Sequence, residues 1–502
     1  MGRAAARVRV SLSLTDRLTS FLNLTRRELI ALVLAFAASL PAVTTRMYSS
    51  DEVEYFSYLR SLWFDRDVSF ENEYQYFYEH DIARSEGFHE TFLERETAAG
   101  RRVNYATMGC ALLWAPFYAV ADVSVRVRRA MGARVAADGY SKPYIAAVAY
   151  GSAFYGFAAV LLSIAAARRI TGPRGAVASA IAVWLGTPLL FYMYVAPPFS
   201  HATSAFAVAV FVVVWLRVRE SWSVGGVALL GLAAAQMAMV REQDIFFAVG
   251  PAFDWALALK QEAGGRRQEA GGRPLSPGAE TRRGRSRGGV RAPLAAAAAG
   301  CVAFAVGYTP QLLAYNALNG YPGPAAHVTR KMTWYAPHGL QVLASPEHGF
   351  LVWTPLAALA LVGLVILAHG GAGGARRIGL CALLMVAFQA YVAGSVASWT
   401  VAGAFGQRRF VAVTILLTIG LAALFTSISG PARRLVTVAA VLCVWWNISL
   451  MAQFGLRLMD RQRMEPAKNA YHAFVTLPRM TPSLVYRYLF DRSSFYQPRE
   501  DR

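Results

Sequence analysis

The chain has 502 residues, of which 56% are hydrophobic and only 16% are charged, and its formal net charge is +20 at pH 7. Soluble globular chains are nearer to roughly 45–50% apolar and 25% charged. Here the apolar residues form blocks of membrane-spanning length, which excludes a soluble multidomain protein and predicts a polytopic membrane protein. The positive charge is compatible with nucleic-acid binding. The basic residues cluster at the ends of apolar blocks, however, so we expect cytoplasmic loops and no nucleic-acid partner.

Apolar blocks long enough for a helix across a hydrocarbon core of ~30 Å predict about eleven transmembrane helices in an all-α fold. They cover residues 28–45, 143–167, 175–195, 201–217, 223–240, 245–259, 293–316, 350–368, 377–397, 409–427 and 432–452. The first block has the basic start and small residues of a signal peptide. The many later spans favour an uncleaved first transmembrane helix.

The positive-inside rule predicts the orientation. Residues 1–27 and 260–292 are rich in arginine, and eleven spans place both of them in the cytoplasm. The loop 46–142 and the tail 453–502 are then external to a cytoplasmic (inner) membrane that the chain crosses many times. Residues 260–292 are of low complexity, which predicts a disordered linker between spans two to six (143–259) and spans seven to eleven (293–452).

Residues 107–123 are apolar and nearly long enough to span. Counting them as a span would move the basic segment 260–292 to the external side. We therefore interpret 107–123 as a helix that lies in the interface or dips into it, a position that suits Trp114 and Tyr118.

The first external loop is strongly acidic: residues 46–106 hold 13 of the 30 acidic residues. Most of these carboxylates are typical of a solvated loop, but Asp51 follows the first span directly. Asp51, Tyr55 and Tyr58 fall on one face of a predicted helix. A carboxylate held there can take a proton from an acceptor hydroxyl. The alternative is a helix start stabilised by its acidic residues, worth about 0.3–1 kcal/mol each.

The remaining residues of this helix predict how it lies. Val53, Phe56, Leu59 and Trp63 recur at helical spacing. An apolar stripe of this kind is typical of a helix lying flat on the membrane surface.

The segment AspGluValGluTyrPhe, directly after the first span, resembles the start of GT-C superfamily membrane glycosyltransferases. The similar branch is bacterial and is related to dolichyl-phosphate-mannose–protein mannosyltransferases and lipid A aminoarabinose transferases. Asp51, Glu52 and Tyr55 match the motif Asp-Glu-x-x-Tyr. The resemblance implies a GT-C-like fold, with Asp51 as the catalytic base and with Glu52 and Tyr55 positioning substrate.

Three further segments extend the resemblance. Residues 107–123 match a second external juxtamembrane helix, and TrpThrPro at 353–355 and GlyGlnArgArgPhe at 406–410 are similar to segments of uncharacterised bacterial members. Glu54 departs from the family, because aminoarabinose transferases often have Arg there. No segment matches the family's Phe-Glu-Lys-Pro type, whose lysine contacts phosphate, and Arg101 or Arg102 is the candidate replacement.

A polyprenyl-phosphate donor requires cations that stabilise the leaving phosphate, and the arginine fork suits this role. Arg241 is the first candidate because it interrupts an apolar stretch, where an ionisable residue is costly. The alternative is a pair with Glu242 or Asp244. Arg408 and Arg409 are the next candidates, at the predicted external end of a span, with interfacial snorkelling as the alternative.

His201 follows ProProPheSer at the predicted external end of a span and is a candidate for positioning the acceptor or the sugar. The alternative is a satisfied interfacial histidine. The histidines in the external stretch 317–350 lack the fixed spacing of a metal site, so we expect no metal and no cofactor. The four cysteines lie in apolar segments and predict neither a disulfide framework nor a metal site.

These features together predict an inverting glycosyltransferase. It would move a sugar from a polyprenyl-phosphate carrier to a lipid, glycan or protein acceptor of the envelope, at the external face of the membrane and among membrane lipids. One alternative is a lipid or solute transporter or flippase. No internal repeat is visible, and a long acidic first loop is not expected of such proteins. A non-catalytic membrane protein of envelope assembly is the other alternative.

Overall fold

The computed structural model describes residues 14–80, 87–270 and 291–491, and these residues are mainly helical. The helices up to residue 130 are α1 (Leu14–Leu22), α2 (Arg26–Ser39), η1 (Leu40–Ala42), α3 (Ser50–Arg60), η2 (Ser61–Asp65), α4 (Glu71–Glu79), η3 (His89–Glu94) and α5 (Gly109–Ala130). Those of the central part are α6 (Lys142–Thr171), α7 (Ala176–Gly186), α8 (Leu189–Tyr194), α9 (His201–Val218), α10 (Val224–Val240), η4 (Glu242–Ala248), α11 (Val249–Ala270) and α12 (Arg291–Asn319). The remaining helices are α13 (Ala326–Arg330), α14 (Gly339–Ala344), α15 (Phe350–Trp353), α16 (Leu356–Gly370), α17 (Gly374–Ser395), η6 (Arg408–Val413), α18 (Thr414–Ser427), α19 (Gly430–Gly455), α20 (Pro466–Tyr471), η7 (His472–Thr476) and α21 (Leu477–Phe490).

Within these residues, seven helices are long and apolar enough to cross a membrane: α5, α6, α9, α12, α17, the continuous pair η6–α18, and α19. Three shorter helices, α7, α10 and α16, are also apolar. Every predicted span coincides with a helix or a broken pair of helices. The predicted all-helical architecture, with helices of membrane-spanning length, is therefore confirmed. The count of eleven crossings and the GT-C fold stay predictions.

Several predicted spans differ in detail from the observed helices; the span 350–368, for example, is divided between α15 and α16. The span 175–195 is broken between α7 and α8, where Pro188 follows Thr187. Asn447 on α19 donates to the carbonyl oxygens of Leu185 and Thr187, so the break leaves these two acceptors satisfied. Helix α11 continues to Ala270, into the predicted linker 260–292, and residues 271–290 of that linker lie outside the described residues.

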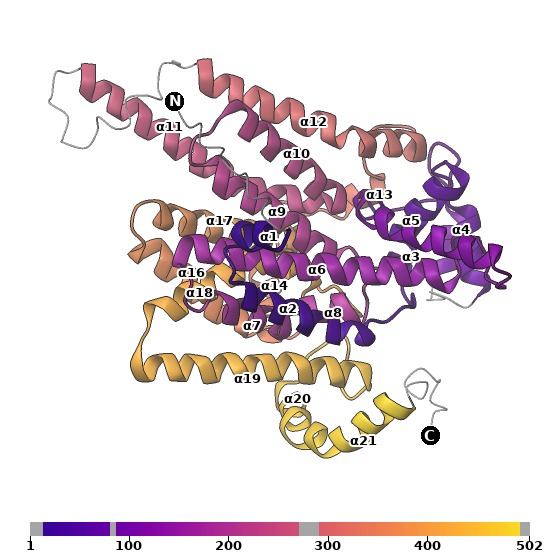
Figure 1. Ribbon diagram of the computed structural model, residues 1–502. Helices are drawn as coiled ribbons and strands as arrows, with labels where there is room; N and C mark the ends of the chain where they lie inside the picture. The colour runs from indigo at the N-terminus through magenta and orange to yellow at the C-terminus, as the bar shows by residue number, and fades with distance from the viewer. Residues whose placement is uncertain (1–13, 81–86, 271–290, 492–502) are drawn as a thin grey trace, which may run out of the picture.

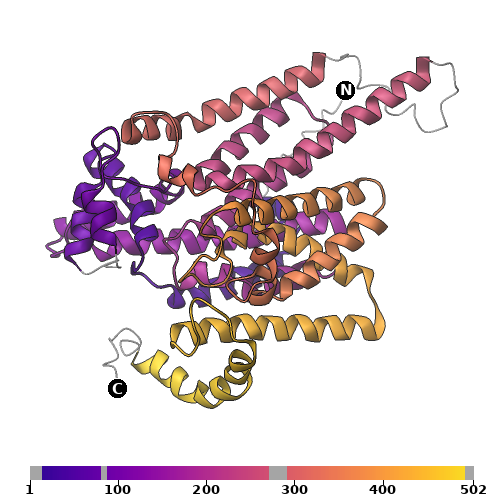
Figure 2. The ribbon, with the colours of Figure 1, turned by 180° about the vertical axis from the view of Figure 1, so that it is seen from behind.

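The helices are arranged around a bundle with two distinct ends (Figures 1 and 2). Helices α3, α4 and α5 gather at one end, whereas the last turns of α11 and the first turns of α12 lie at the other. The predicted external loop and the two flanks of the arginine-rich segment therefore occupy opposite ends. Helix α19 runs along the bundle, and helices α20 and α21 of the predicted tail lie beside it.

Helix α5 is longer than the predicted interfacial segment and by length alone could cross a membrane. It lies alongside the first half of α6: Trp114 donates to Ser152 Oγ, and Tyr144 donates to Asp122. Its first turn presses on the end of α10, because a Cβ on Gly109 would lie only 2.3 Å from the carbonyl carbon of Met239. These contacts place α5 at the α3 end of the bundle, and the interfacial position of 107–123 stays a prediction.

Helix α3 begins at a capping box, in which the Glu52 carboxylate accepts from the backbone N–H of Ser49 at 3.0 Å. The predicted membrane-facing stripe is wrong for most of its length. Val53, Phe56 and Leu59 are buried, and Phe56 packs edge-on against Phe77 of α4 and Tyr118 of α5. Apolar periodicity indicates a buried face, but it does not distinguish lipid from protein as the partner.

Candidate functional site

Asp51 lies in the first turn of α3 and is paired with an arginine from the other end of the chain. Arg408 Nη1 donates to Asp51 Oδ2 at 2.7 Å, across 357 positions of sequence. Both side chains keep solvent access, with 38% of Asp51 and 24% of Arg408 exposed. Arg408 uses one of its five N–H donors for this contact, so the guanidinium has other donors for a second anion.

The backbone before Arg408 fixes where the two adjacent arginines point. Gly406 has φ of +60°, a conformation that favours glycine, and a Cβ there would meet Pro188 at 2.8 Å. Arg409 is buried and donates to the backbone oxygen of Ser398 at 3.0 Å and to its hydroxyl at 3.3 Å. The inward direction of Arg409 is not that of a snorkelling side chain, which reaches toward water.

Arg241 occupies the expected break between two helices, because α10 ends at Val240 and the Arg241 backbone is extended. Its Nη1 donates to Nδ1 of His201 at 3.0 Å, at the start of α9. No carboxylate of the described residues is in hydrogen-bond contact with Arg241, although its charge acts on the buried Asp244. Glu242 accepts from Tyr315, and Asp244 accepts from Ser204. Arg241 thus keeps its charge without a carboxylate in hydrogen-bond contact.

His201 is 3% exposed and acts as an acceptor toward Arg241 through Nδ1, which requires the neutral imidazole with its proton on Nε2. Its ring stacks on Phe199, and the Arg408 guanidinium lies 5.5 Å from the centre of the same Phe199 ring. The charges of Arg241, Arg408 and Arg409 all act on this imidazole.

Tyr55 completes the group. It interacts with the side chain of Ser200 and electrostatically with Arg241 and Asp51. We call Asp51, Tyr55, His201, Arg241, Arg408 and Arg409 the Asp51 site. Six of the seven residues selected from the sequence are therefore brought together, from α3, the start of α9, the α10–η4 break and η6. In this group three guanidinium groups accompany the carboxylate of Asp51, and Asp244, on which the charge of Arg241 also acts, is a second carboxylate beside it. The balance stays positive, which favours an anionic ligand.

Glu52 and Tyr58 lie apart from this group. Glu52 is 1% exposed, and its carboxylate accepts from the backbone N–H groups of Tyr48 and Ser49. It therefore caps α3, and its role in positioning substrate stays a prediction. Tyr58 is fully buried and interacts with Glu54 and Glu242. Arg102, a candidate replacement for the family's lysine, pairs with Glu71 and Glu96.

Glu54 is a residue whose role the sequence did not predict. It is 6% exposed, its Oε1 accepts from the backbone N–H of Tyr105 at 2.6 Å, and its backbone oxygen accepts from Asn104. Burial, followed by the charge of Asp51, raises the pKa of Glu54 to about 8. Glu54 ties the segment before α5 to the helix that carries Asp51. The signals available in the sequence were its position three residues after Asp51 and its departure from the Arg of the aminoarabinose transferases.

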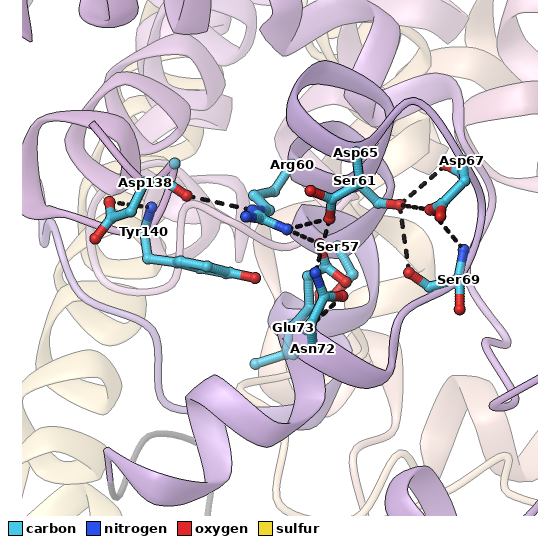
Figure 3. A network of polar contacts seen from close by, with 12 residues as sticks. Ser57, Arg60, Ser61, Asp65, Asp67, Ser69, Asn72, Glu73, Asp138 and Tyr140 are labelled. Atoms are coloured by element: carbon cyan, nitrogen blue, oxygen red, sulfur yellow. Dashed lines mark hydrogen bonds and ion pairs between the residues drawn. The ribbon is translucent and has the colours of Figure 1, made fainter. Parts of the chain in front are cut away.

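A second acid–arginine cluster lies at the other end of α3 (Figure 3). Arg60 pairs with Asp65 and donates to Glu73 at 3.0 Å and to the backbone oxygen of Asp138 at 3.3 Å. Its guanidinium lies 4.4 Å from the ring centre of Tyr140. We call Arg60, Asp65, Glu73 and Tyr140 the Arg60 cluster. Glu73 is fully buried, and burial raises its pKa to about 7.

Within residues 14–80, 87–270 and 291–491, no group of three potential metal-ligating side chains is found. The histidines of 317–350 instead contact aromatic rings: His338 stacks on Trp399 and His348 on Trp353. His348 Nε2 also contacts the backbone oxygen of Ala404. These histidines therefore contribute to packing around the segments that precede η6.

No protein-family model, curated protein or solved structure matches the chain.

Proposed function

We propose that the chain is an inverting membrane glycosyltransferase that transfers a sugar from a polyprenyl-phosphate carrier to an envelope acceptor at the external face of the cytoplasmic membrane. The observation that carries this proposal is the Asp51–Arg408 contact of 2.7 Å, within reach of the charges of Arg241 and Arg409. A base and an anion-binding group at one place are what such a transfer requires.

The proposed reaction uses the two kinds of group in one step. Asp51 accepts the proton of the acceptor hydroxyl, and the acceptor oxygen attacks the anomeric carbon of the sugar. The bond from that carbon to the phosphate oxygen breaks, and the polyprenyl phosphate leaves with the additional negative charge. Arg408 and Arg241 stabilise this charge through N–H donors that their protein contacts leave free. Attack opposite the leaving group inverts the anomeric centre.

The remaining members of the site have supporting roles in this proposal. His201 accepts from Arg241 and therefore orients its guanidinium. Arg409 is held by Ser398 and adds positive charge without needing to touch the donor. Tyr55, on the Asp51 face of α3, is placed to contact the acceptor or the sugar. The resemblance of AspGluValGluTyrPhe to the GT-C motif supports the same assignment of Asp51.

The test is Asp51→Asn, which keeps the shape of the side chain and removes the base. A general base contributes about 10²–10⁴-fold to the rate, so we expect transfer from polyprenyl-phosphate hexoses or pentoses to fall by that factor while thermal stability stays near that of the wild type. Donor binding is expected to persist, because the arginines remain.

Glu71→Gln is the matched control. Glu71 is also a carboxylate of the first loop paired with an arginine, since Arg102 lies 3.0 Å away, but it is 63% exposed and outside the Asp51 site. It should transfer sugar at the wild-type rate. An Asp51→Asn protein with wild-type turnover across the donor panel would remove Asp51 as the base and the proposal with it.

A further inference from the structure

A second polar recess lies at the end of the bundle opposite the Asp51 site, where α6 and α9 end and α17 begins. It is a cavity of about 310 Å³ whose lining includes Arg169, Arg219, Glu220 and Gly374. Ile170, Leu216 and Ile378 supply an apolar wall. Charged groups beside an apolar wall at the ends of membrane-length helices are typical of a place where a lipid headgroup meets the bilayer.

Arg219 is held firmly in this cavity by a fully buried carboxylate. Its Nε donates to Asp254 Oδ2 at 2.6 Å and its Nη2 to Asp254 Oδ1 at 3.0 Å. Arg377 also approaches Asp254, at 3.3 Å. The third nitrogen of Arg219, Nη1, has no hydrogen-bond partner among the described residues, and it lies 3.5 Å from the position a Cβ on Gly374 would take. This fork is therefore preorganised with one nitrogen directed at the start of α17.

The other groups around the cavity add positive potential. Arg169 pairs with Glu220 but is 42% exposed, so its remaining donors are accessible. The charged residues of the lining are two arginines and one carboxylate, Arg169, Arg219 and Glu220. Behind them Arg377 and the buried Asp254 balance each other, which leaves one positive charge in excess. Helix α17 also begins beside this cavity, but the backbone N–H of Ala375 in its first turn already donates to the carbonyl oxygen of Ala372 at 3.0 Å. The arginine side chains are therefore the donors that the cavity offers.

We propose that this cavity binds the phosphate of an anionic phospholipid, with Arg219 Nη1 and Arg169 as donors and the acyl chains along the apolar wall. The site is separate from the Asp51 site and does not depend on the proposed transferase activity. A zwitterionic phospholipid brings no net charge to balance the excess, so the cavity should prefer phosphatidylglycerol to phosphatidylcholine.

The test is Gly374→Asp, which places a carboxylate beside Arg219 Nη1. An acidic residue in the first turn suits a helix, so α17 should still form. We expect the affinity of the purified protein for short-chain phosphatidylglycerol in neutral detergent to fall about fivefold or more, the factor that corresponds to ~1 kcal/mol per charge near a membrane surface.

Gly225→Asp is the matched control, because Gly225 also lies in a first helical turn, in α10, and nothing lies within 4 Å of its Cβ position. Arg169→Gln is a second variant whose exposed side chain is not needed for folding, and it too should weaken the binding. Unchanged phosphatidylglycerol affinity in both Gly374→Asp and Arg169→Gln would overturn the site. Equal affinity for phosphatidylcholine would overturn the charge preference. Inorganic phosphate that binds as tightly as the lipid would show that the site takes free phosphate.

Discussion

The two ends of helix α3 carry acid–arginine clusters of opposite balance. At the first turn, Asp51 pairs with Arg408, and Arg409 interacts electrostatically with Asp51, Arg408 and Arg241. In the last turn, Arg60 is the one guanidinium between two carboxylates. In the Arg60 cluster the charged groups pair with one another, and they join α3 to α4 and to residues 138–140 (Figure 3). The Asp51 site retains positive charge and solvent access, which leaves it open to an anion.

The Arg60 cluster has the features of a structural ion pair, because its cation is matched by carboxylates and one of them is fully buried. The Asp51 site has those of a binding site, because it has excess cations and is partly exposed. Glu73 has no exposed side-chain surface, whereas Asp51 keeps 38%. Removing one partner of a buried pair leaves an uncompensated charge and costs much more than removing one partner of an exposed pair. The same change, arginine to glutamine, should therefore have different consequences at the two ends of α3.

The largest effect on folding is expected for Arg60→Gln. It leaves the fully buried Glu73 without its cation, so above pH 7, where this carboxyl is ionised in the wild type, the free energy of unfolding should fall by up to about 3–5 kcal/mol. Arg408→Gln is the matched variant, and it should lower that free energy by no more than about 1 kcal/mol. Thermal unfolding in detergent measures both. Equal losses of unfolding free energy in the two variants would contradict the distinction between a structural cluster at Arg60 and an open site at Asp51.

The next effect is on binding. Arg241→Gln should weaken binding of a polyprenyl-phosphate sugar about 10- to 100-fold, the range for a hydrogen bond to a charged group of roughly 1.5–3 kcal/mol. Arg241→Lys should keep part of the affinity, since the charge survives and the fork does not. Arg126→Gln on α5, 63% exposed and paired with Asp122, is the control. Titration of fluorescent donor analogues would detect the difference, and unchanged affinity in Arg241→Gln would exclude Arg241 from the donor site.

A third effect is the pH dependence of stability. Burial raises the pKa of Glu54 to about 8 and that of Glu73 to about 7, from 4.5. The folded chain therefore holds protons that the unfolded chain has released, and the stability that these two groups contribute is lost as pH rises from about 4.5 to 8. The unfolding temperature should fall over this window and fall less in Glu54→Gln. A wild-type unfolding temperature that rises over the same window would show that the burial of these two carboxyls does not control the pH dependence.

Single cysteine substitutions at exposed positions should perturb the protein least, and they test on which side of the membrane the two clusters lie. The α3 end is predicted to be external and the turn between α16 and α17 cytoplasmic, and Ala99 and Ala372 are exposed residues near these two places. Ala99→Cys should react with an impermeant thiol reagent in intact cells, whereas Ala372→Cys should react only after permeabilisation. Reaction of Ala372→Cys from outside would require a different number of crossings.

The sequence by itself determined the helical membrane-type architecture, the break at Arg241 and the helix that begins near Asp51. These features depend on local properties: hydropathy over about 20 residues, an ionisable residue in an apolar run, and the capping pattern of Ser49 and Glu52. Each of these features depends on residues that are close together in the sequence, so the way the helices pack against one another did not change it.

Only the tertiary structure decided which charges meet. Asp51 and Arg408 are 357 positions apart, and Arg241 finds His201 although Glu242 and Asp244 are its neighbours in sequence. The burial of Val53 and Phe56 against α4 and α5, and the inward direction of Glu54, depend on the same packing. Coulomb energy depends on the distance between charges and on the surrounding dielectric, and in a bundle both are set by which helices pack together.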